Sequence, residues 1–158
     1  QNLAASEATT RSQLAASCDL VVASEAARFC TPGVDIGLFC STPGVALARA
    51  VPRKSAMEML LLGEMIPAEE AQRMGLVNRV VPPEAVLPTA LALAQQIASR
   101  SAVAVQLGKR GFNAQQAMPL REAYAAAGAV MVENLMAEDA AEGIGAFVAK
   151  RKPEWRHR

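Results

Sequence analysis

The N-terminal third of the chain mixes short apolar runs with small and polar residues. Residues 14–18, LAASC, are typical of the end of a helix built from small side chains. Residues 20–23, LVVA, form a continuous apolar run of the kind found in a strand covered on both faces. Residues 24–27 predict one helical turn that starts at a serine, and residues 28–30 predict a second short strand. Together these elements predict an α/β fold.

Residues 31–44 are punctuated by proline and glycine and predict a long loop. The tetrapeptide TPGV occurs twice in this region, starting at Thr31 and at Thr42, and a single acid, Asp35, lies between the two copies. Two copies alone do not indicate a solenoid, which needs a sustained period. Because loops of this kind often line functional sites, Asp35 is a candidate for chemistry.

Proline and glycine also bracket two predicted helices. Pro52 is well placed in the first turn of a helix that ends at Leu62, before Gly63. Residues 67–75 repeat this arrangement over a shorter span. Residues 76–81, LVNRVV, alternate loosely and stop at two prolines, which predicts a strand.

From residue 82 onward the pattern becomes helical, with apolar residues recurring at three- or four-residue steps. The predicted helices span residues 84–99, 101–116, 119–136 and 138–150. The third carries one apolar stripe, made of Leu120, Tyr124, Ala127, Met131 and Leu135. We therefore expect an α/β part over residues 1–81 and a helical region over residues 82–158.

Composition limits the class of protein. A chain of 158 residues is long enough for one domain with a buried core. Its 16 basic and 15 acidic residues leave a net charge of +1, so no overall field attracts nucleic acid or an anionic membrane. No apolar run has the length that crosses a bilayer, so we expect a soluble globular protein without a membrane partner.

Cysteine and histidine usage argues against several kinds of active site. Cys18, Cys30 and Cys40 are odd in number and lack CxxC spacing, which favours free thiols in a reducing compartment. The only histidine, His157, is second from the end, so we expect neither a His-ligated metal site nor a Cys/His or Ser/His pair. Without a base nearby in the sequence, Cys30 and Cys40 are interpreted as apolar filler.

The first residues, QNLAASEATTRSQ, match neither a signal peptide nor an Arg-rich transit peptide. The sequence does not begin with Met, and it reaches buried-looking residues within a few positions. We therefore expect a fragment that lacks the N-terminal part of its protein, and a protein that is not secreted.

Four segments together resemble the crotonase superfamily, the enoyl-CoA hydratase/isomerase family, in the family's own order. They are QLAASCDLVVAS (13–24), ARFCTPGVDIGLFCSTPG (27–44), RAVPRKSAMEMLLLGEMIPAEEAQRMGLVNRVV (49–81) and GIGAFVAKRKPEW (143–155). The sequences of the segments TPGV and GLFCSTPGVALARAVPR resemble, more narrowly, one branch of the family and its bacterial relatives. The resemblance implies a crotonase-like spiral of βαβ units, followed by C-terminal helices that build homotrimers, usually paired into hexamers.

The resemblance also implies chemistry on an acyl-CoA thioester, with no further cofactor. Family members stabilise an enolate-like oxyanion with two backbone N–H groups. One donor belongs to a part of the family domain that precedes this chain, and the other falls on Thr10, where the family's glycines are replaced. Either the donor geometry is lost there, or the ATTRSQ stretch is atypical because the beginning of the fragment is disturbed.

By the same resemblance, the two glutamates of family hydratases fall on Gln13 and Gly33. A glutamine can orient water but cannot take its proton, and glycine has no side chain. Asp35 is the remaining carboxylate in the loop, and an isomerase-like enzyme could use it as a proton shuttle. Alternatively, an acid in a turn flanked by glycines caps backbone N–H groups.

The basic C-terminal tail resembles the family's CoA-binding end. The pattern F-x-x-K-R falls on Phe147, Lys150 and Arg151, where it would close over the CoA nucleotide, often of a neighbouring subunit. Cations there suit phosphates. The alternative is a solvated basic end. RNA binding is not expected, because the tail lacks interleaved aromatic residues and a wider basic face.

We therefore expect an acyl-CoA-binding protein of the hydratase/isomerase type, with hydratase activity disfavoured by the loss of both glutamates. The alternative is a non-catalytic crotonase-fold subunit that serves assembly or interaction. The family resemblance places such a protein in the cytoplasm of a bacterium or in the mitochondrial matrix of a eukaryote.

Overall fold

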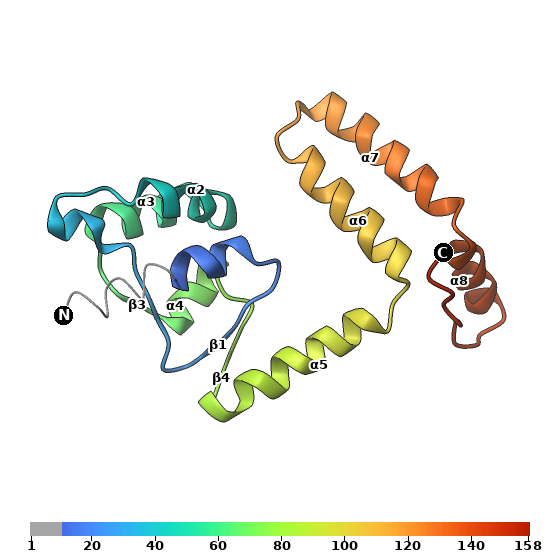
Figure 1. Ribbon diagram of the computed structural model, residues 1–158, viewed down its shortest axis with the longest axis horizontal. Helices are drawn as coiled ribbons and strands as arrows, with labels where there is room; N and C mark the ends of the chain where they lie inside the picture. Colours follow the sequence, from blue (N-terminus) through green and yellow to red (C-terminus); the bar gives the residue numbers. More distant parts are fainter. Residues whose placement is uncertain (1–10) are drawn as a thin grey trace. The chain divides into compact units, whose positions relative to one another are not determined.

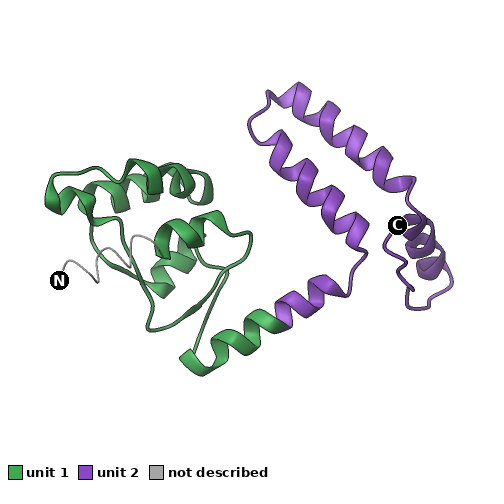
Figure 2. Cartoon of the chain, in the orientation of Figure 1, with its two compact units in different colours: residues 1–91 green, residues 92–158 purple. Residues whose placement is uncertain are grey.

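The structure, a computed structural model, describes residues 11–158 (Figure 1). The chain divides into two compact units, residues 1–91 and residues 92–158 (Figure 2). The division lies inside helix α5 (Val86–Ala98), later along the chain than the change of pattern after residue 81. Within the described part of the chain, no helix is long and apolar enough to cross a membrane.

The described part of the first unit contains two small sheets of two strands each (Figure 1). Strand β1 (Val22–Ser24) pairs in parallel with β4 (Arg79–Val81), and β2 (Arg28–Phe29) pairs antiparallel with β3 (Ile66–Pro67). A parallel pair needs a long connection, and three α-helices lie in the chain between β1 and β4. This mixture of strands and connecting helices confirms the α/β layer expected from the sequence.

The chain passes from β1 to β2 through a hydrogen-bonded turn, so the helical turn predicted for residues 24–27 is wrong. The backbone N–H of Ala27 donates to the carbonyl of Ser24 over 2.8 Å. The N–H of Ala26 donates to the Ser24 hydroxyl oxygen over 3.1 Å. The serine side chain thus satisfies the backbone of a turn instead of starting a helix.

Much of the loop predicted over residues 31–44 is helical, which corrects that prediction. A 3₁₀ helix, η1, spans Pro32–Ile36, and α2 spans Ser41–Ala50. Pro43 lies in the first turn of α2, where a backbone N–H would have no partner within the helix. Proline is therefore compatible with a helix at this position, and the second TPGV copy belongs to α2.

Helices α3 (Arg53–Leu62) and α4 (Ala68–Arg73) confirm the two helices predicted between prolines and glycines. Gly63 ends α3 in the left-handed conformation, with φ 67°, which glycine adopts without a steric penalty. Apolar side chains from these helices and from the strands form one core. Its large members are Phe29, Leu47, Val51, Met59, Leu60, Leu76 and Val77.

The second unit is helical, as predicted. It contains the end of α5, then α6 (Ala102–Gln115), α7 (Leu120–Leu135) and α8 (Glu138–Val148). A short 3₁₀ helix, η2 (Pro83–Ala85), precedes α5 in the first unit. The side chain of Ser101 caps α6 by accepting a hydrogen bond from the backbone N–H of Ala104 over 3.3 Å. Helices α6 and α7 lie side by side (Figure 1).

The apolar stripe of α7 is largely exposed in the single chain. The exposed fractions are 75% for Leu120, 74% for Tyr124 and 59% for Met131. An apolar groove of about 260 Å³ lies between α6 and α7, lined in part by Phe112, Val130 and Met131. The two helices approach closely at Gly111, where an added Cβ would lie 3.1 Å from both methyl groups of Val130.

Candidate functional site

The loop around Gly33 folds tightly onto itself. The backbone N–H of Leu38 donates to the carbonyl of Gly33 over 2.9 Å. The N–H of Gly33 donates to the thiol sulfur of Cys40 over 3.3 Å. Gly37 ends η1 with φ 78°, in the left-handed region, so the chain can reverse there. The first residues of η1 are thus held against the segment that leads into α2.

This folding leaves no room for a side chain at position 33. A Cβ added to Gly33 would lie 2.7 Å from the Cys40 sulfur and 2.7 Å from the Leu38 carbonyl oxygen. Real Cβ atoms essentially never show such short contacts, and one of the two clashing atoms belongs to the backbone. Glycine is therefore required by this conformation, and the space beside its Cα is occupied by Cys40 and Leu38.

Asp35 lies in η1 and is exposed. Among the hydrogen bonds and ion pairs of residues 11–158, none involves its carboxylate. An added Cβ at Gly63 would lie 3.2 Å from its Oδ1, so the carboxylate sits near the C-terminal end of α3. Two exposed apolar side chains follow Asp35 in the sequence. Ile36 is 69% exposed and Leu38 is 63% exposed.

Gln13 belongs to the helical residues 11–17 and is exposed. Its backbone carbonyl accepts a hydrogen bond from the Ser17 hydroxyl over 2.8 Å. The preceding residue, Ser12, is buried, and its hydroxyl oxygen accepts a hydrogen bond from the Cys30 N–H over 3.0 Å. This bond joins the helical segment to the chain just before the Gly33 loop. Thr10 lies outside the described residues.

The Cys30 thiol is held in its protonated form. Burial raises its pKa, and the neighbouring Cys40 and Asp35 raise it further, while Arg11 acts in the opposite direction. Because the thiolate is the nucleophilic form, a raised pKa makes this sulfur less reactive. Next to it, the buried Thr31 hydroxyl donates to the Met59 carbonyl over 2.8 Å and joins the loop to α3.

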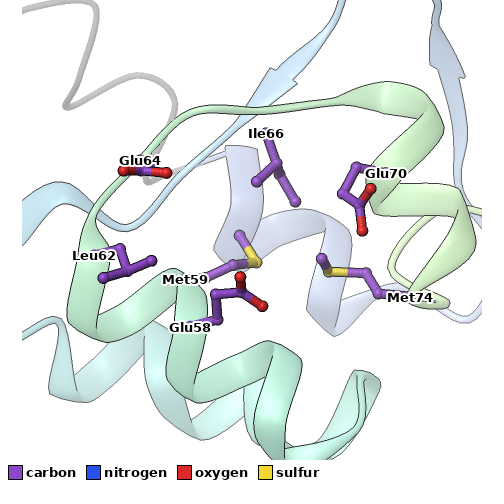
Figure 3. Close-up of a pocket in the computed structure, with 7 residues that line it drawn as sticks. All are labelled: Glu58, Met59, Leu62, Glu64, Ile66, Glu70 and Met74. Carbon is purple, nitrogen blue, oxygen red and sulfur yellow. The ribbon is translucent and has the colours of Figure 1, made fainter.

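A small cavity lies in the first unit between residues of α3 and α4 (Figure 3). Its volume is about 90 Å³. This volume is well below the roughly 300 to 1,000 Å³ of typical ligand pockets. Within residues 11–158, no group of three His, Cys, Asp or Glu side chains could hold a metal ion. The cavity is lined by Glu58, Met59, Leu62, Glu64, Ile66, Glu70 and Met74.

The predicted CoA-binding residues lie at the C-terminal end of α8. The N–H of Lys150 donates to the Phe147 carbonyl over 3.1 Å, and the N–H of Arg151 donates to the Ala146 carbonyl over 3.0 Å. This pair of bonds is a Schellman motif, which places Lys150 in the left-handed conformation with φ 53°. That conformation costs a lysine roughly 1 to 2 kcal/mol relative to the right-handed one. Phe147 is 84% exposed.

Arg151 is engaged within the chain. Its guanidinium donates two hydrogen bonds to the Glu142 carboxylate, over 2.6 and 2.8 Å. The N–H of Glu154 also donates to this carboxylate, over 2.8 Å. The hydrogen bonds from Arg151, followed by the one from Glu154, lower the pKa of Glu142 to about 2. Sequence patterns gave no sign of Glu142, because its partners follow it by nine or more residues.

A second carboxylate holds the end of the chain. Asp139 is buried, and its oxygens accept hydrogen bonds from the backbone N–H groups of Arg156 over 2.7 Å and of His157 over 3.1 Å. A hydrogen bond from the Ser101 side chain is the largest of several effects that lower the pKa of Asp139. The Trp155 indole N–H donates to the Ser99 carbonyl over 2.9 Å. Residues 151–158 are thus fastened to α8 and to the segment before α6.

The chain is similar in sequence to known proteins. The profile of a protein family described as "Enoyl-CoA hydratase/isomerase" matches residues 11–158. "Enoyl-CoA hydratase domain-containing protein 3, mitochondrial" from Mus musculus is 54% identical over 145 residues, which are 92% of this chain and 48% of the relative. The chain therefore spans about half the length of the curated relatives that it matches.

Solved structures agree with these matches. The crystal structure of an enoyl-CoA hydratase from Mycobacterium smegmatis has a TM-score of 0.90 and 48% identity, over 93% of this chain and 57% of that one. The crystal structure of human enoyl-CoA hydratase domain-containing protein 3 has a TM-score of 0.86 and 53% identity, over 91% and 57% of the two chains. The fold expected from the sequence, and the branch indicated by the TPGV wording, are confirmed.

Proposed function

We propose a function from the premise that this chain belongs to the enoyl-CoA hydratase/isomerase family, whose profile matches residues 11–158. The full-length protein binds an acyl-CoA thioester and stabilises the enolate-like oxyanion of that thioester with backbone N–H groups. It acts by isomerisation, or by another reaction that needs the oxyanion site and one acid, rather than by adding water. Its substrate is the CoA thioester itself, and no other cofactor takes part.

The observation that carries this proposal is the packing at Gly33. The family resemblance assigns a hydratase glutamate to this position, and an added Cβ would lie 2.7 Å from both the Cys40 sulfur and the Leu38 carbonyl oxygen. A carboxylate is therefore absent from the sequence and also sterically excluded by the loop. With Gln13 at the other glutamate position, neither residue can take a proton from water.

Asp35 is the acid best placed to serve an isomerisation. Within the described residues its carboxylate is exposed and has no hydrogen-bond or ion-pair partner, so it is available to exchange protons. The exposed apolar side chains of Ile36 and Leu38 beside it suit the hydrocarbon part of an acyl group. The proposed role of Asp35 is to move a proton between two carbon atoms of the bound acyl chain.

The CoA nucleotide is assigned to Phe147 and Lys150. Phe147 is 84% exposed, which suits stacking on an adenine ring. Lys150 is exposed and has no ion pair within the described part of the chain, so its ammonium group is available for a phosphate. Arg151 supports this surface indirectly, because its guanidinium is bound to Glu142.

Calorimetric titration of the full-length protein with a short- or medium-chain acyl-CoA tests binding. We expect measurable affinity, and the absence of binding at millimolar ligand would reject the proposal. With an isomerisable enoyl-CoA, Asp35→Asn should lower kcat by at least about 100-fold and leave the affinity for CoA unchanged. The control is Glu69→Gln, which removes another exposed acid of the first unit. Unchanged turnover in Asp35→Asn would remove Asp35 from the mechanism.

A second candidate function is a non-catalytic subunit for assembly, which the exposed apolar stripe of α7 favours. In this reading the helices of the second unit build a homotrimer or hexamer, and the chemistry is lost. Light scattering by the full-length protein would measure the oligomeric state. Robust turnover of crotonyl-CoA or of a dienoyl-CoA would reject a purely structural role.

The site of action is proposed from the relatives. The vertebrate relatives carry the word mitochondrial in their names. We place a eukaryotic protein of this sequence in the mitochondrial matrix and a bacterial one in the cytoplasm. Fractionation of the source cells, followed by detection of the protein, checks this assignment.

A further inference from the structure

Two non-glycine residues among residues 11–158 have a positive φ, and both lie at the C-terminal end of the chain. They are Lys150, with φ 53°, and His157, with φ 62°. Side chains that carry a Cβ rarely adopt this conformation unless the surrounding structure imposes it. The groups that hold Lys150 in the left-handed conformation therefore help to identify the role of this residue.

Glu142 adds a second constraint to the Schellman motif at this position. Its carboxylate accepts two hydrogen bonds from the guanidinium of Arg151, the residue directly after Lys150. It accepts a third from the backbone of Glu154, so the chain on the C-terminal side of Lys150 is tied back to α8. Arg151 also donates to the Lys152 carbonyl over 3.1 Å. Bonds to an ionised carboxylate are stronger than bonds between neutral groups.

We propose that Glu142 is a positioning residue for the CoA-binding surface, which acts by tying residues 151–154 to α8 and so holds Lys150 in its left-handed conformation near Phe147. This inference rests on the proposed function, in which Lys150 and Phe147 bind the nucleotide end of CoA. Glu142 also neutralises Arg151, whereas Lys150 has no ion pair within the described residues.

Without Glu142, fewer hydrogen bonds restrain the chain that follows Lys150, so its left-handed conformation is less strongly held. The Schellman motif alone favours glycine at this position, and a lysine released from the tie moves to the right-handed or extended regions. The ammonium group then no longer has one preferred position relative to Phe147. The Lys150 side chain must then be ordered each time a phosphate binds, and this ordering lowers the affinity.

The test is calorimetric titration of the full-length protein with two probes, coenzyme A and an acyl-pantetheine thioester that lacks the nucleotide. Glu142→Gln should weaken the binding of coenzyme A about tenfold, the effect of one charge-assisted hydrogen bond, and leave the pantetheine thioester unchanged. The matched control is Glu133→Gln, which removes an exposed Arg–Glu pair of the same unit that does not involve residues 151–158. It should leave both affinities unchanged.

A double-mutant cycle separates positioning from a general loss of structure. If Glu142 acts through Lys150, the double variant Glu142→Gln/Lys150→Ala should bind coenzyme A no more weakly than Lys150→Ala alone. Lys150→Gly suits the left-handed conformation but lacks the ammonium group. It should therefore keep or raise the Tm while losing the same affinity as Lys150→Ala. Additive losses in the cycle would overturn the inference.

Failure of this inference can be distinguished from failure of the proposed function. If the wild-type protein binds neither coenzyme A nor an acyl-CoA, both are rejected together. If it binds an acyl-CoA but not coenzyme A, only the positioning role is rejected. If it binds coenzyme A and Glu142→Gln binds equally well, only the positioning role is rejected. Should Glu142→Gln fail to fold by circular dichroism, Arg151→Lys provides the same test, because it keeps the charge and removes the bidentate geometry.

Discussion

The two units of the chain differ in how much apolar core they bury. In the first unit, most buried residues form one apolar core that includes Phe29, Leu47 and Met59, and the buried hydroxyls of Ser12 and Thr31 are hydrogen-bonded. In the second unit, the buried residues among those described are the polar Ser101 and Asp139 and the apolar Leu107, Ala123 and Ala146. Apolar burial therefore stabilises the first unit, whereas hydrogen bonds to carboxylates hold the end of the second.

The second unit also leaves a large part of its apolar surface exposed. Exposed apolar surface of this extent typically marks an interaction site. Both units leave large apolar side chains exposed, but among the described residues only residues 11–91 also enclose an apolar core of this size. The large exposed apolar side chains of the second unit are Ile97, Val105, Phe112, Met118, Leu120, Tyr124, Met131, Val132, Leu135, Met136, Ile144, Phe147 and Val148.

The largest expected effect compares one substitution in the two units. Leu47 is 1% exposed and Leu120 is 75% exposed. Leu47→Ala should lower the free energy of unfolding by about 2 to 5 kcal/mol, because it removes contacts and leaves a cavity. Leu120→Ala should lower it by less than about 0.5 kcal/mol in protein dilute enough to be monomeric. Urea unfolding of the full-length variants measures both values, and equal losses would contradict the comparison.

A glycine from each unit provides the next contrast. An added Cβ at Gly33 meets the Cys40 sulfur and the Leu38 carbonyl oxygen, whereas one at Gly128 in α7 has no heavy atom within 4 Å. Gly33→Ala should therefore destabilise the protein by about 1 to 3 kcal/mol. Gly128→Ala should stabilise it by roughly 0.5 to 1 kcal/mol, because alanine is the better helix former. Thermal unfolding gives the sign of each change, and a stable Gly33→Ala would mean that the loop can open.

The smallest effect is the pH dependence of the second unit. Folding lowers the pKa of Glu142 from 4.5 to about 2. The stability that this group contributes is therefore present above about pH 4.5 and is lost as the pH falls toward 2. The Tm of Glu142→Gln should lie below that of the wild type at pH 6, and the two values should converge in this acidic range. A difference independent of pH would show that the charge of Glu142 does not matter.

Local elements were predictable because local patterns determine them. Each of the four C-terminal helices begins and ends within two residues of its prediction, since the apolar periodicity marks its extent. The start of α2 was missed because Pro43 and Gly44 indicated a loop, although proline is tolerated in a first helical turn. The turn at residues 24–27 was missed because a serine can cap a helix or close a turn.

The contacts of the candidate site were not predictable, because they join residues far apart in the chain. The hydrogen bond from Cys30 to Ser12 spans 18 residues, and that from Thr31 to Met59 spans 28. Asp139 is likewise held by residues 156 and 157 and by Ser101. No periodic pattern indicates such pairs, because they depend on how the elements pack.

The sequence by itself determined the family, the order of the elements and the absence of a glutamate at position 33, because these are properties of residue identity and local pattern. Only the tertiary structure decided what occupies the space beside Gly33, where Cys40 and Leu38 lie too close for any side chain. It also decided which charged groups are engaged, since Arg151 is bound to Glu142 while Asp35 remains exposed. Those outcomes follow from packing between distant segments, which a linear pattern does not encode.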